Sequence, residues 1–280
     1  MSRGLVLEFT KMHGAGNDFI VIDNRFYYLN LQELADIAVK YCPRQFGIGA
    51  DGVLALDEPL TEDHHFHMTY FNADGSPGEM CGNGARCLAR FAFEAGLTEQ
   101  PLRFSTTSGN IEGYVDPSDS RRVRIVLPAP SAIKREFTEL IVDGRRLAFS
   151  YVQAGVPHAV NFGENVDDNP VDEWGAFVRH HSAFFPTNGA NVDFVEVTKR
   201  GPEPRLRVRC YERGVEAETL ACGTGAVASF AAAVELGLIE DEESVIEMRG
   251  GELRVGYTAG RASIFLEGPA VVVYRGTVVL

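Results

Sequence analysis

The chain has 280 residues, five cysteines and a formal net charge of −13 at pH 7. This length accommodates one large domain or two ordinary ones, and the acidic balance argues against nucleic acid as a partner, because phosphate binding requires a basic surface. The sparse, odd set of cysteines argues against a secreted disulfide framework, and no apolar run reaches the 18 residues of a membrane-spanning helix. Since residues 1–14 show no secretory leader, we expect a cytoplasmic protein without a membrane partner.

The first half of the chain reads as strands interrupted by two helices. Period-two patterns and turn residues predict strands at 5–9, 19–23, 53–56, 66–70, 102–106, 111–115 and 123–127, with a glycine-rich turn at 13–18. Asn30 is a suitable N-cap for a helix at 31–41, and a second helix begins after Cys81 and ends at Gly96. The prolines at 128 and 130 then suggest a domain boundary.

The second half repeats this mixture of strands and helices. We expect strands at 147–153, 159–162, 193–197 and 206–211. We also expect a helix at 171–181 with its core positions at Trp174, Phe177, Val178 and His181. Another helix follows Cys222, and the tail at 245–280 reads as strands with turns at 250–251, 259–260 and 275–276. The expected domains are 1–127, completed by C-terminal strands at 268–280, and 128–267.

An internal repeat connects the two halves. The 17 residues from Cys81 and the 17 from Cys222 align without a gap, share 8 identities and lie 141 positions apart. A shorter echo pairs residues 14–15 and 18–19 with 189–190 and 193–194, which would give the first half insertions. The repeat predicts an α/β (α+β) fold of two pseudo-symmetric duplicated halves. Each half is expected to be a mostly antiparallel sheet wrapped around a central helix, with the active site in the cleft between the halves.

Both Cys81 and Cys222 stand at the start of a helix, directly before Gly-x-Gly-Ala. A helix N-terminus binds carboxylates and favours thiolate, so each cysteine is a candidate acid or base. Two such thiols facing one carbon could remove a proton from one side and return a proton on the other, which inverts a stereocentre. The helix N-termini would stabilise the negative charge that develops on a substrate carboxylate, and no metal or other cofactor is needed.

Several other motifs have a simple structural interpretation. Residues 47–52 fit the glycine pattern of dinucleotide sites, but a helix precedes them and a strand follows, which is the wrong context. Surface or packing positions are expected for the histidines without a converging set of ligands, namely His64, His65, His67, His180 and His181. A structural role is expected for the cysteines outside the glycine motif, namely Cys42, Cys87 and Cys210.

Two places keep a structural and a functional interpretation open. His158 is expected in a turn, where a histidine can act in function or simply pack. Glu212 and Arg213 end a strand just before the second cysteine loop. They can form a surface ion pair, but their location favours substrate ligands.

The chain resembles the diaminopimelate epimerases in five segments that span both halves. These are Lys11-Met-His-Gly-Ala-Gly-Asn-Asp-Phe19, Phe71-Asn-Ala-Asp-Gly75, Cys81-Gly-Asn-Gly-Ala-Arg-Cys87, Tyr211-Glu-Arg-Gly214 and Glu218-Thr-Leu-Ala-Cys-Gly-Thr-Gly225. The resemblance implies two pseudo-symmetric halves, a homodimer and a small amino acid as substrate. It further implies interconversion of LL- and meso-2,6-diaminopimelate without PLP, in lysine and peptidoglycan precursor synthesis.

The resemblance also implies roles for residues at matching positions. Cys81 and Cys222 would be the two acid/base thiols, with His158 and Glu212 tuning them. The substrate-binding residues would be Asn17, Asn72, Gly82, Asn83, Asn191, Glu212, Arg213, Gly223 and Thr224. Arg213 would bind a carboxylate in a bidentate pair. Tyr274 would lie at the dimer interface, and no metal site is implied.

The chain departs from the family pattern at a few positions. Many members have Asn where this chain has Val156 and Gln where it has Gly52, and Glu216 and Glu218 make the segment before Cys222 acidic. These differences affect contacts to the far end of the substrate rather than the thiol pair. Two alternatives stay open: a proline or hydroxyproline racemase with a shorter pocket, and a non-catalytic thiol switch in which the two repeat cysteines form a disulfide.

Overall fold

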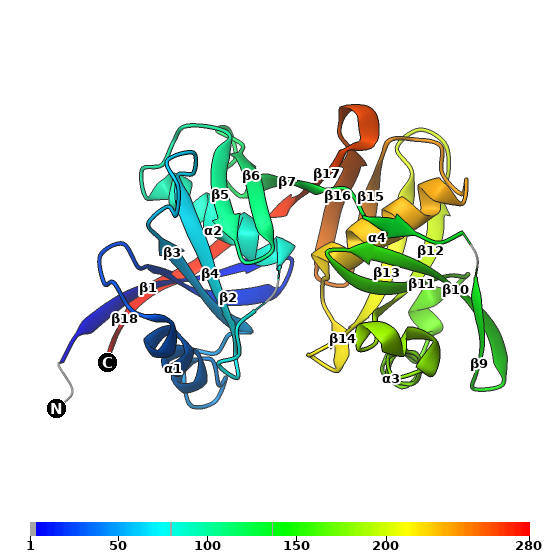
Figure 1. Cartoon of the computed structure of the whole chain (residues 1–280), viewed down its shortest axis with the longest axis horizontal. Helices are drawn as coiled ribbons and strands as arrows, with labels where there is room; N and C mark the ends of the chain where they lie inside the picture. Colours follow the sequence, from blue (N-terminus) through cyan, green and yellow to red (C-terminus); the bar gives the residue numbers. More distant parts are fainter. Residues whose placement is uncertain (1–3, 79, 136) are drawn as a thin grey trace. The chain divides into compact units, whose positions relative to one another are not determined.

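The computed structural model describes residues 4–78, 80–135 and 137–280. Contacts within the chain divide it into two units, Met1–Ile125 with Gly268–Leu280, and Val126–Glu267 (Figure 1). The chain passes from the first unit to the second within β7 (Arg122–Pro128) and returns within β17 (Ser263–Pro269). The C-terminal strand β18 (Val271–Val279) therefore belongs to the first unit, where it pairs with β1 (Val6–Gly14).

The first unit combines a sheet with two helices, α1 (Leu31–Tyr41) and α2 (Gly82–Glu94). Its further strands are β2 (Asn17–Asp23), β3 (Gly52–Asp57), β4 (Phe66–Asn72), β5 (Leu102–Thr106) and β6 (Gly109–Val115). Successive residues of β3 face opposite ways. Val53 and Ala55 share a core cluster with α1, whereas Leu54 lies against Gly84 of α2. The sheet therefore separates two layers, one for each helix.

The second unit contains the helices α3 (Val171–Arg179) and α4 (Gly223–Glu235). Its strands are β8 (Ala132–Ile133), β9 (Thr138–Val142), β10 (Arg145–Ala154), β11 (Val156–Phe162), β12 (Asn191–Lys199), β13 (Arg205–Glu212), β14 (Ala217–Thr219), β15 (Glu243–Met248) and β16 (Gly251–Tyr257). Short 3-10 helices lie at Val166–Asp168, Ser182–Thr187 and Ala259–Arg261. Trp174 and Val178 of α3 pack with Phe194 of β12 in one core cluster.

Strand pairing follows the same succession in both units, which confirms the duplicated α/β (α+β) fold. In the first unit the strands pair in the order β18–β1–β2–β3–β4–β5–β6. The pairs β2–β3 and β4–β5 are parallel, and the other four pairs are antiparallel. The pairs β9–β10, β10–β11, β11–β12, β12–β13, β13–β15 and β15–β16 repeat that series. Parallel strands need a long crossover connection. The crossover of the first parallel pair contains α1 in the first unit and α3 in the second, and the crossover of the second parallel pair contains α2 and α4, respectively.

The equivalence of the strands in the two units shows that the shorter internal echo does not align corresponding positions. Gly14-Ala15 lies in the β1–β2 hairpin, whereas Gly189-Ala190 leads into β12, which corresponds to β3. The counterpart of Gly189 is Gly49, which leads into β3, and the two have φ angles of 78° and 80°. Gly49 precedes Cys81 by 32 residues and Gly189 precedes Cys222 by 33. The prediction that the first half carries insertions is therefore wrong.

The two repeat helices begin and end in the same way. Cys81 and Cys222 are the N-caps of α2 and α4, and each sulfur accepts a hydrogen bond from the N–H three residues ahead. Gly96 and Gly237 follow the helices with positive φ. The N–H groups of each glycine and of the next leucine bond carbonyls of the last turn, which is a Schellman motif. A cysteine thus occupies the position where Ser or Asp usually caps a helix.

Both repeat helices are buried as central helices. In α4 every residue from 223 to 233 is buried, in agreement with its apolar sequence. The strands that surround α4 are β8, β10 to β13, β15 and β16 (Figure 1). In α2 residues 82–89 are buried, and the helix contacts β1, β2, β3 and β6. The sheet of each unit therefore wraps around its repeat helix.

Three local predictions are wrong. The first hairpin turn is only Ala15-Gly16, both with positive φ, because pairing continues to the end of β1 and β2. Arg275-Gly276 lies within β18 instead of a turn, and Gly276 lets Phe9 approach, since a Cβ there would lie 2.9 Å from the ring. Helix α3 ends at Arg179, and Phe177 is 48% exposed, because Trp174 and its neighbours already fill the face toward the sheet.

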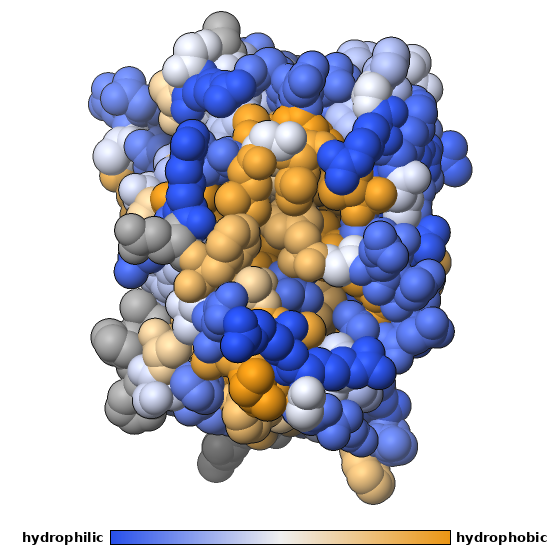
Figure 2. Space-filling view, turned by 90° about the vertical axis from the view of Figure 1, so that its right-hand side faces the viewer, coloured by the Kyte–Doolittle hydropathy of each residue, from blue (hydrophilic) through white to orange (hydrophobic). Residues whose placement is uncertain are grey.

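Figure 2 shows a face on which hydrophobic side chains gather in one area and hydrophilic side chains surround it. Among the described residues, no helix has the length and apolar composition needed to cross a membrane. Exposed apolar side chains also occur on β18, at Val273 and Tyr274.

An ion network in the first unit leads to a prediction about acid stability. Arg44 and Lys11 bond the carboxylate of Asp18; burial raises the pKa of Asp18, but these bonds and charges hold it at about 2, below the ordinary 3.8. The interaction stabilises the fold above pH 4, and this stabilisation is lost as the pH falls through 2.

Between pH 5 and 2, the urea midpoint of the natural chain should fall more steeply than that of Asp18→Asn. Asp119→Asn, at an exposed ion pair that solvent screens, should change the slope less than Asp18→Asn; equal slopes in the natural chain and Asp18→Asn would contradict the argument.

Candidate active site

The first unit holds five of the expected catalytic and substrate-binding residues: Asn17, Asn72, Cys81, Gly82 and Asn83. The half-buried Cys81 accepts a hydrogen bond on Sγ from the N–H of Gly84 at 3.3 Å. Its thiol donates to Oδ1 of Asn17 at 3.5 Å. Asn72 ends β4, and its amide donates to Ser76 at 3.0 Å.

A chain of side-chain amides orients the groups next to Cys81. Oδ1 of Asn17 also accepts from Nδ2 of Asn83 at 3.2 Å, while Nδ2 of Asn17 donates to Asp51 at 2.7 Å. Oδ1 of Asn83 accepts from Nη2 of Arg86 at 2.7 Å. These bonds assign both amide orientations, so Asn17 presents its oxygen to the thiol.

Arg86 is a buried cation beside this network, and sequence analysis did not select it. Its side chain is 0% exposed, and its Nε has no hydrogen-bond partner within the described residues. Burial lowers the pKa of the guanidinium to about 10, so the group stays charged at neutral pH. Thiolates at Cys87 and Cys81 raise that pKa in turn. Burial raises the pKa of Cys87 itself to about 12, so this thiol stays neutral and supplies no negative charge at neutral pH.

The second unit holds the remaining expected residues: His158, Asn191, Glu212, Arg213, Cys222, Gly223 and Thr224. Sγ of Cys222 accepts from the N–H of Gly225 at 3.4 Å and lies 3.4 Å from Oγ1 of Thr224. Cys222 is buried, unlike Cys81. The two thiols therefore have the same relation to a helix but different surroundings.

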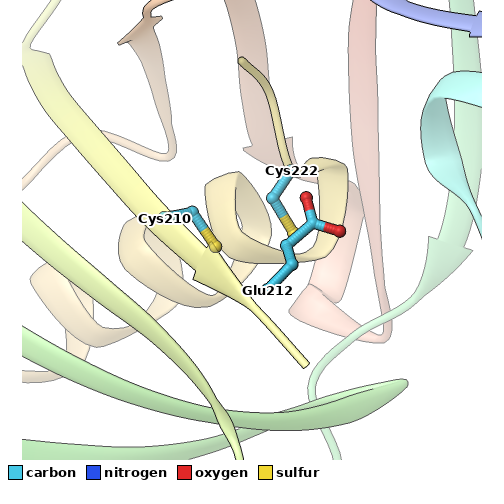
Figure 3. Close-up of side chains that lie close together, drawn as sticks. All are labelled: Cys210, Glu212 and Cys222. Carbon is cyan, nitrogen blue, oxygen red and sulfur yellow. The ribbon is translucent and has the colours of Figure 1, made fainter. Parts of the chain in front are cut away.

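Two groups from β13 lie beside Cys222 (Figure 3). Cys210 and Glu212 are two residues apart on the strand, so their side chains point to the same face. One ligand atom from each of Cys210, Glu212 and Cys222 lies within 4.8 Å of the others. Oγ1 of Thr219 donates to Glu212 at 2.5 Å. Cys210, expected to be a structural residue, is therefore a neighbour of the candidate catalytic thiol.

These neighbours favour the protonated form of Cys222. The hydrogen bond from Cys210 lowers the pKa of the Cys222 thiol, whereas burial raises it. The carboxylates of Glu212 and Asp193 raise it further, and the net shift is upward. Burial also raises the pKa of Glu212, although the hydrogen bonds with Thr219 and Cys222 oppose the shift.

His158 does not lie in a turn, because Gly155 alone separates β10 from β11 and pairing resumes before the histidine. It is fully buried, with Nδ1 2.7 Å from Oδ2 of Asp193 and Nε2 3.3 Å from Nδ2 of Asn191. Oδ1 of Asn191 accepts from the N–H of Arg213 at 2.7 Å, so the amide turns its NH2 group toward the ring. Nε2 therefore accepts, and Nδ1 carries the proton that is donated to Asp193.

Asp193 is a further residue that sequence analysis did not select. It is fully buried, and its Oδ1 has no hydrogen-bond partner within the described chain. A Cβ on Gly225 would lie 2.5 Å from this oxygen, so the glycine lets the carboxylate approach the first turn of α4. The sequence signal that could have identified Asp193 is a carboxylate within an apolar strand, because an acidic side chain is rarely buried without a partner.

The other candidate motifs do not form a site. Three histidines each have a separate partner: His64 bonds Thr61, His65 bonds the N–H of Arg103, and His67 bonds Ser105. They belong to no group of three metal-ligating side chains among the residues that the structure describes. Residues 47–52 lead into β3 rather than into a helix, so the glycine pattern lacks its dinucleotide-binding context.

A family model described as diaminopimelate epimerase matches residues 9–127 and 150–273. The chain belongs to the diaminopimelate epimerase family. A relative of this name from Hydrogenobaculum sp. is 40% identical over 275 residues, which cover 95% of this chain and 96% of the relative. Another, from Methanothrix thermoacetophila, is 42% identical over 284 residues, 97% of this chain and 96% of the relative. These relatives are named as an isomerase, diaminopimelate epimerase, and the match covers nearly their full length.

Solved structures outside the diaminopimelate epimerases show the same fold. A PhzF-family phenazine biosynthesis protein from Bacillus anthracis has a TM-score of 0.74 and 16% identity, covering 99% of this chain and 100% of its own. A hydroxyproline epimerase from Agrobacterium vitis with bound trans-4-hydroxy-L-proline has a TM-score of 0.71 and 16% identity, covering 98% and 91%. At this identity the likeness concerns the fold alone.

The departures from the epimerase pattern can now be placed. A Cβ on Gly52 would lie 2.4 Å from the carbonyl oxygen of Phe71, so the chain has no room there for the Gln of many epimerases. Glu216 and Glu218 pair with arginines of their own unit, which neutralises them. Val156 begins β11, and nothing in the structure explains why it replaces Asn.

Proposed function

We propose that the chain is a cofactor-independent epimerase that interconverts LL- and meso-2,6-diaminopimelate, with Cys81 and Cys222 as its two acid/base groups. The observation that carries the proposal is the matched position of the two cysteines as N-caps of the repeat helices. Family membership and the shared name of the relatives support the choice of substrate. The reaction would serve lysine and peptidoglycan precursor synthesis in the cytoplasm.

The mechanism uses one thiolate and one thiol on opposite faces of the α-carbon. The thiolate takes the α-proton from one face, and the thiol gives its proton to the other, so the stereocentre is inverted. N–H groups and side chains of the first helical turns, at Gly82, Asn83, Gly223 and Thr224, stabilise the carboxylate as its negative charge grows. Afterwards the two sulfurs have exchanged protonation states and must re-equilibrate with solvent. The scheme needs neither PLP nor a metal, because the thiols supply both proton positions.

Local charge assigns the resting protonation states. A nearby cation stabilises a thiolate, and nearby carboxylates disfavour it. Cys81 has the buried Arg86 as its neighbour, whereas Cys222 has Glu212 and Asp193. Loss of the proton that the Cys81 thiol donates to Asn17, which the charge of Arg86 favours, makes Cys81 the thiolate of the resting enzyme, and Cys222 is the thiol. His158 and Glu212 act by tuning Cys222.

The far end of the substrate distinguishes diaminopimelate from proline. Diaminopimelate has a second amino-acid centre, which needs a group for its carboxylate and polar groups for its ammonium. Arg213 would bind the carboxylate in a bidentate pair. The amides of Asn17, Asn72 and Asn191, with the carboxylate of Glu212, would supply the remaining polar contacts.

A deuterium experiment tests this function. The purified chain is incubated with LL-diaminopimelate in D2O, and products are followed by chiral chromatography and mass spectrometry. We expect meso product that carries one deuterium at the inverted α-carbon. Proline and trans-4-hydroxyproline serve as parallel substrates and should not be inverted. Inversion of these instead of diaminopimelate would select the racemase alternative, and no turnover of any substrate would contradict an epimerase.

We also propose that the chain forms a homodimer through the β1–β18 pair. Tyr274 is 43% exposed and packs edge-to-face on Phe9 at 5.9 Å, and Val273 is also exposed. A second copy that covers these apolar side chains would remove them from water. We expect Tyr274→Glu to change the mass measured by light scattering from dimer to monomer. The control Ile141→Glu, at an exposed apolar position of the second unit, should stay dimeric; a dimeric Tyr274→Glu would contradict the proposal.

A further inference from the structure

Three potential metal ligands meet beside the candidate thiol of the second unit. The sulfurs of Cys210 and Cys222 and a carboxylate oxygen of Glu212 lie within 4.8 Å of one another (Figure 3). Both cysteines are buried and Glu212 is half-buried. Among the residues that the structure describes, no other three Cys, His, Asp or Glu side chains form such a group.

The spacing suits a tetrahedral cation after a small adjustment. Zinc holds sulfur at about 2.3 Å and carboxylate oxygen at about 2.0–2.2 Å, so its ligand atoms stand roughly 3.5–3.8 Å apart. The three atoms need to close by about 1.3 Å at most, within the range of small side-chain rotations. Two of them come from the end of β13 and the third from the start of α4, so the ligands stand on regular elements.

The chemistry of the ligands indicates which cations fit. Two sulfur ligands select zinc and softer ions over magnesium or calcium, which prefer oxygen. Two thiolates and one carboxylate bring three negative charges to the divalent ion, and the N-terminus of α4 offsets part of the excess. Three protein ligands leave the fourth position for water, as in other open zinc sites.

The first unit lacks these ligands at the corresponding positions. The repeat offset of 141 residues places Thr69 opposite Cys210 and Phe71 opposite Glu212. Neither side chain offers a thiolate or a carboxylate, so Cys81 lacks the two partners that Cys222 has. The difference between the units provides an internal control.

We propose that Cys210, Glu212 and Cys222 form a reversible inhibitory site for a divalent cation of the zinc type. Binding forms two metal–sulfur bonds and one metal–oxygen bond, and the two thiol protons are released to solvent. The Cys222 sulfur is then bonded to the cation, so it can neither take nor give a proton. A chelator removes the cation, and the sulfurs take up protons again. This site adds regulation by metal to the proposed epimerase.

Cadmium provides a direct measurement of the site. The full chain, reduced and without substrate, is titrated with Cd2+ alone while the ultraviolet absorption of cadmium–thiolate bonds is followed. We expect saturation at about one ion per chain, competition by Zn2+ and reversal by EDTA. Cys210→Ala should weaken Cd2+ binding at least about 100-fold, because it removes one of the three ligands. Cys87→Ala, which removes an equally buried thiol from the first unit, should bind as the natural chain does.

The titration needs no turnover, so its result is separate from the test of the epimerase reaction. Equal Cd2+ affinities of the natural chain and Cys210→Ala would overturn the proposal. The same holds for binding that is lost in Cys81→Ala but kept in Cys222→Ala, or for a natural chain without a cadmium–thiolate signal. Circular dichroism verifies folding. If Cys210→Ala does not fold, Cys210→Ser, which preserves the volume, replaces it with the same expectation.

Discussion

Cys222→Ala is expected to lower kcat/KM for epimerisation by at least about 1,000-fold, and Cys81→Ala by a similar factor. Each variant lacks one of the two proton positions, and general acid–base catalysis by a placed group contributes on the order of 100- to 10,000-fold. The two losses should not multiply, because one thiol alone cannot invert the α-carbon. The double variant is therefore expected to be no slower than either single variant. Initial rates of meso-diaminopimelate formation measure all three.

The same variants should separate the two half-reactions. In Cys222→Ala the Cys81 thiolate can still remove the α-proton of one epimer and return deuterium to the same face. We expect one of the two epimers to exchange its α-proton in D2O without inversion, and the other epimer to exchange in Cys81→Ala. Cys42→Ala is the control, because burial raises the pKa of Cys42 to about 12 and keeps it a neutral thiol. Inversion in either catalytic variant at a rate near that of the natural chain would contradict the two-thiol mechanism.

The two thiols can be located from the sequence because their signal is local. Cys-Gly-x-Gly-Ala followed by a glycine at the far end describes both caps of one helix, and its repetition 141 residues later singles out the pair. The same locality explains why the helix at 31–41 is predicted correctly. Asn30 and Glu33 form the reciprocal bonds of a capping box within four consecutive residues.

The surroundings of the thiols could not be predicted in the same way, because they depend on pairing between distant segments. His158 and Asp193 meet through the parallel pair β11–β12, although 35 residues separate them. Arg86 is accommodated beside Gly14, where a Cβ would lie 3.3 Å from the guanidinium. The echo between Gly14 and Gly189 failed for a related reason, since a dipeptide match carries no information about which strands pair.

Arg86→Met is expected to lower the reactivity of Cys81 strongly. The guanidinium is fully buried, and its Nε has no partner in the described chain, so its charge needs a balance that the network of amides does not provide. We infer that the balancing charge is the Cys81 thiolate. An opposite charge near an ionisable group shifts its pKa by about 1–3 units, and each unit corresponds to a factor of about 10 in the thiolate population. Alkylation of Cys81 by iodoacetamide at pH 7 should slow by about 10-fold or more, and kcat/KM should fall at least as much.

Two further variants distinguish charge from packing. Arg86→Lys keeps a cation in the same place and should recover most of the Cys81 reactivity. Arg90→Met removes an arginine one turn along α2, where it pairs with Glu94, and should leave Cys81 unchanged. The free energy of unfolding of Arg86→Met should stay within about 1 kcal/mol of the natural value or rise, because methionine fills much of the space without a buried charge. Lower reactivity at equal stability would mean that the chain retains this charge for its chemistry, whereas unchanged alkylation in Arg86→Met would assign the thiolate to another cause.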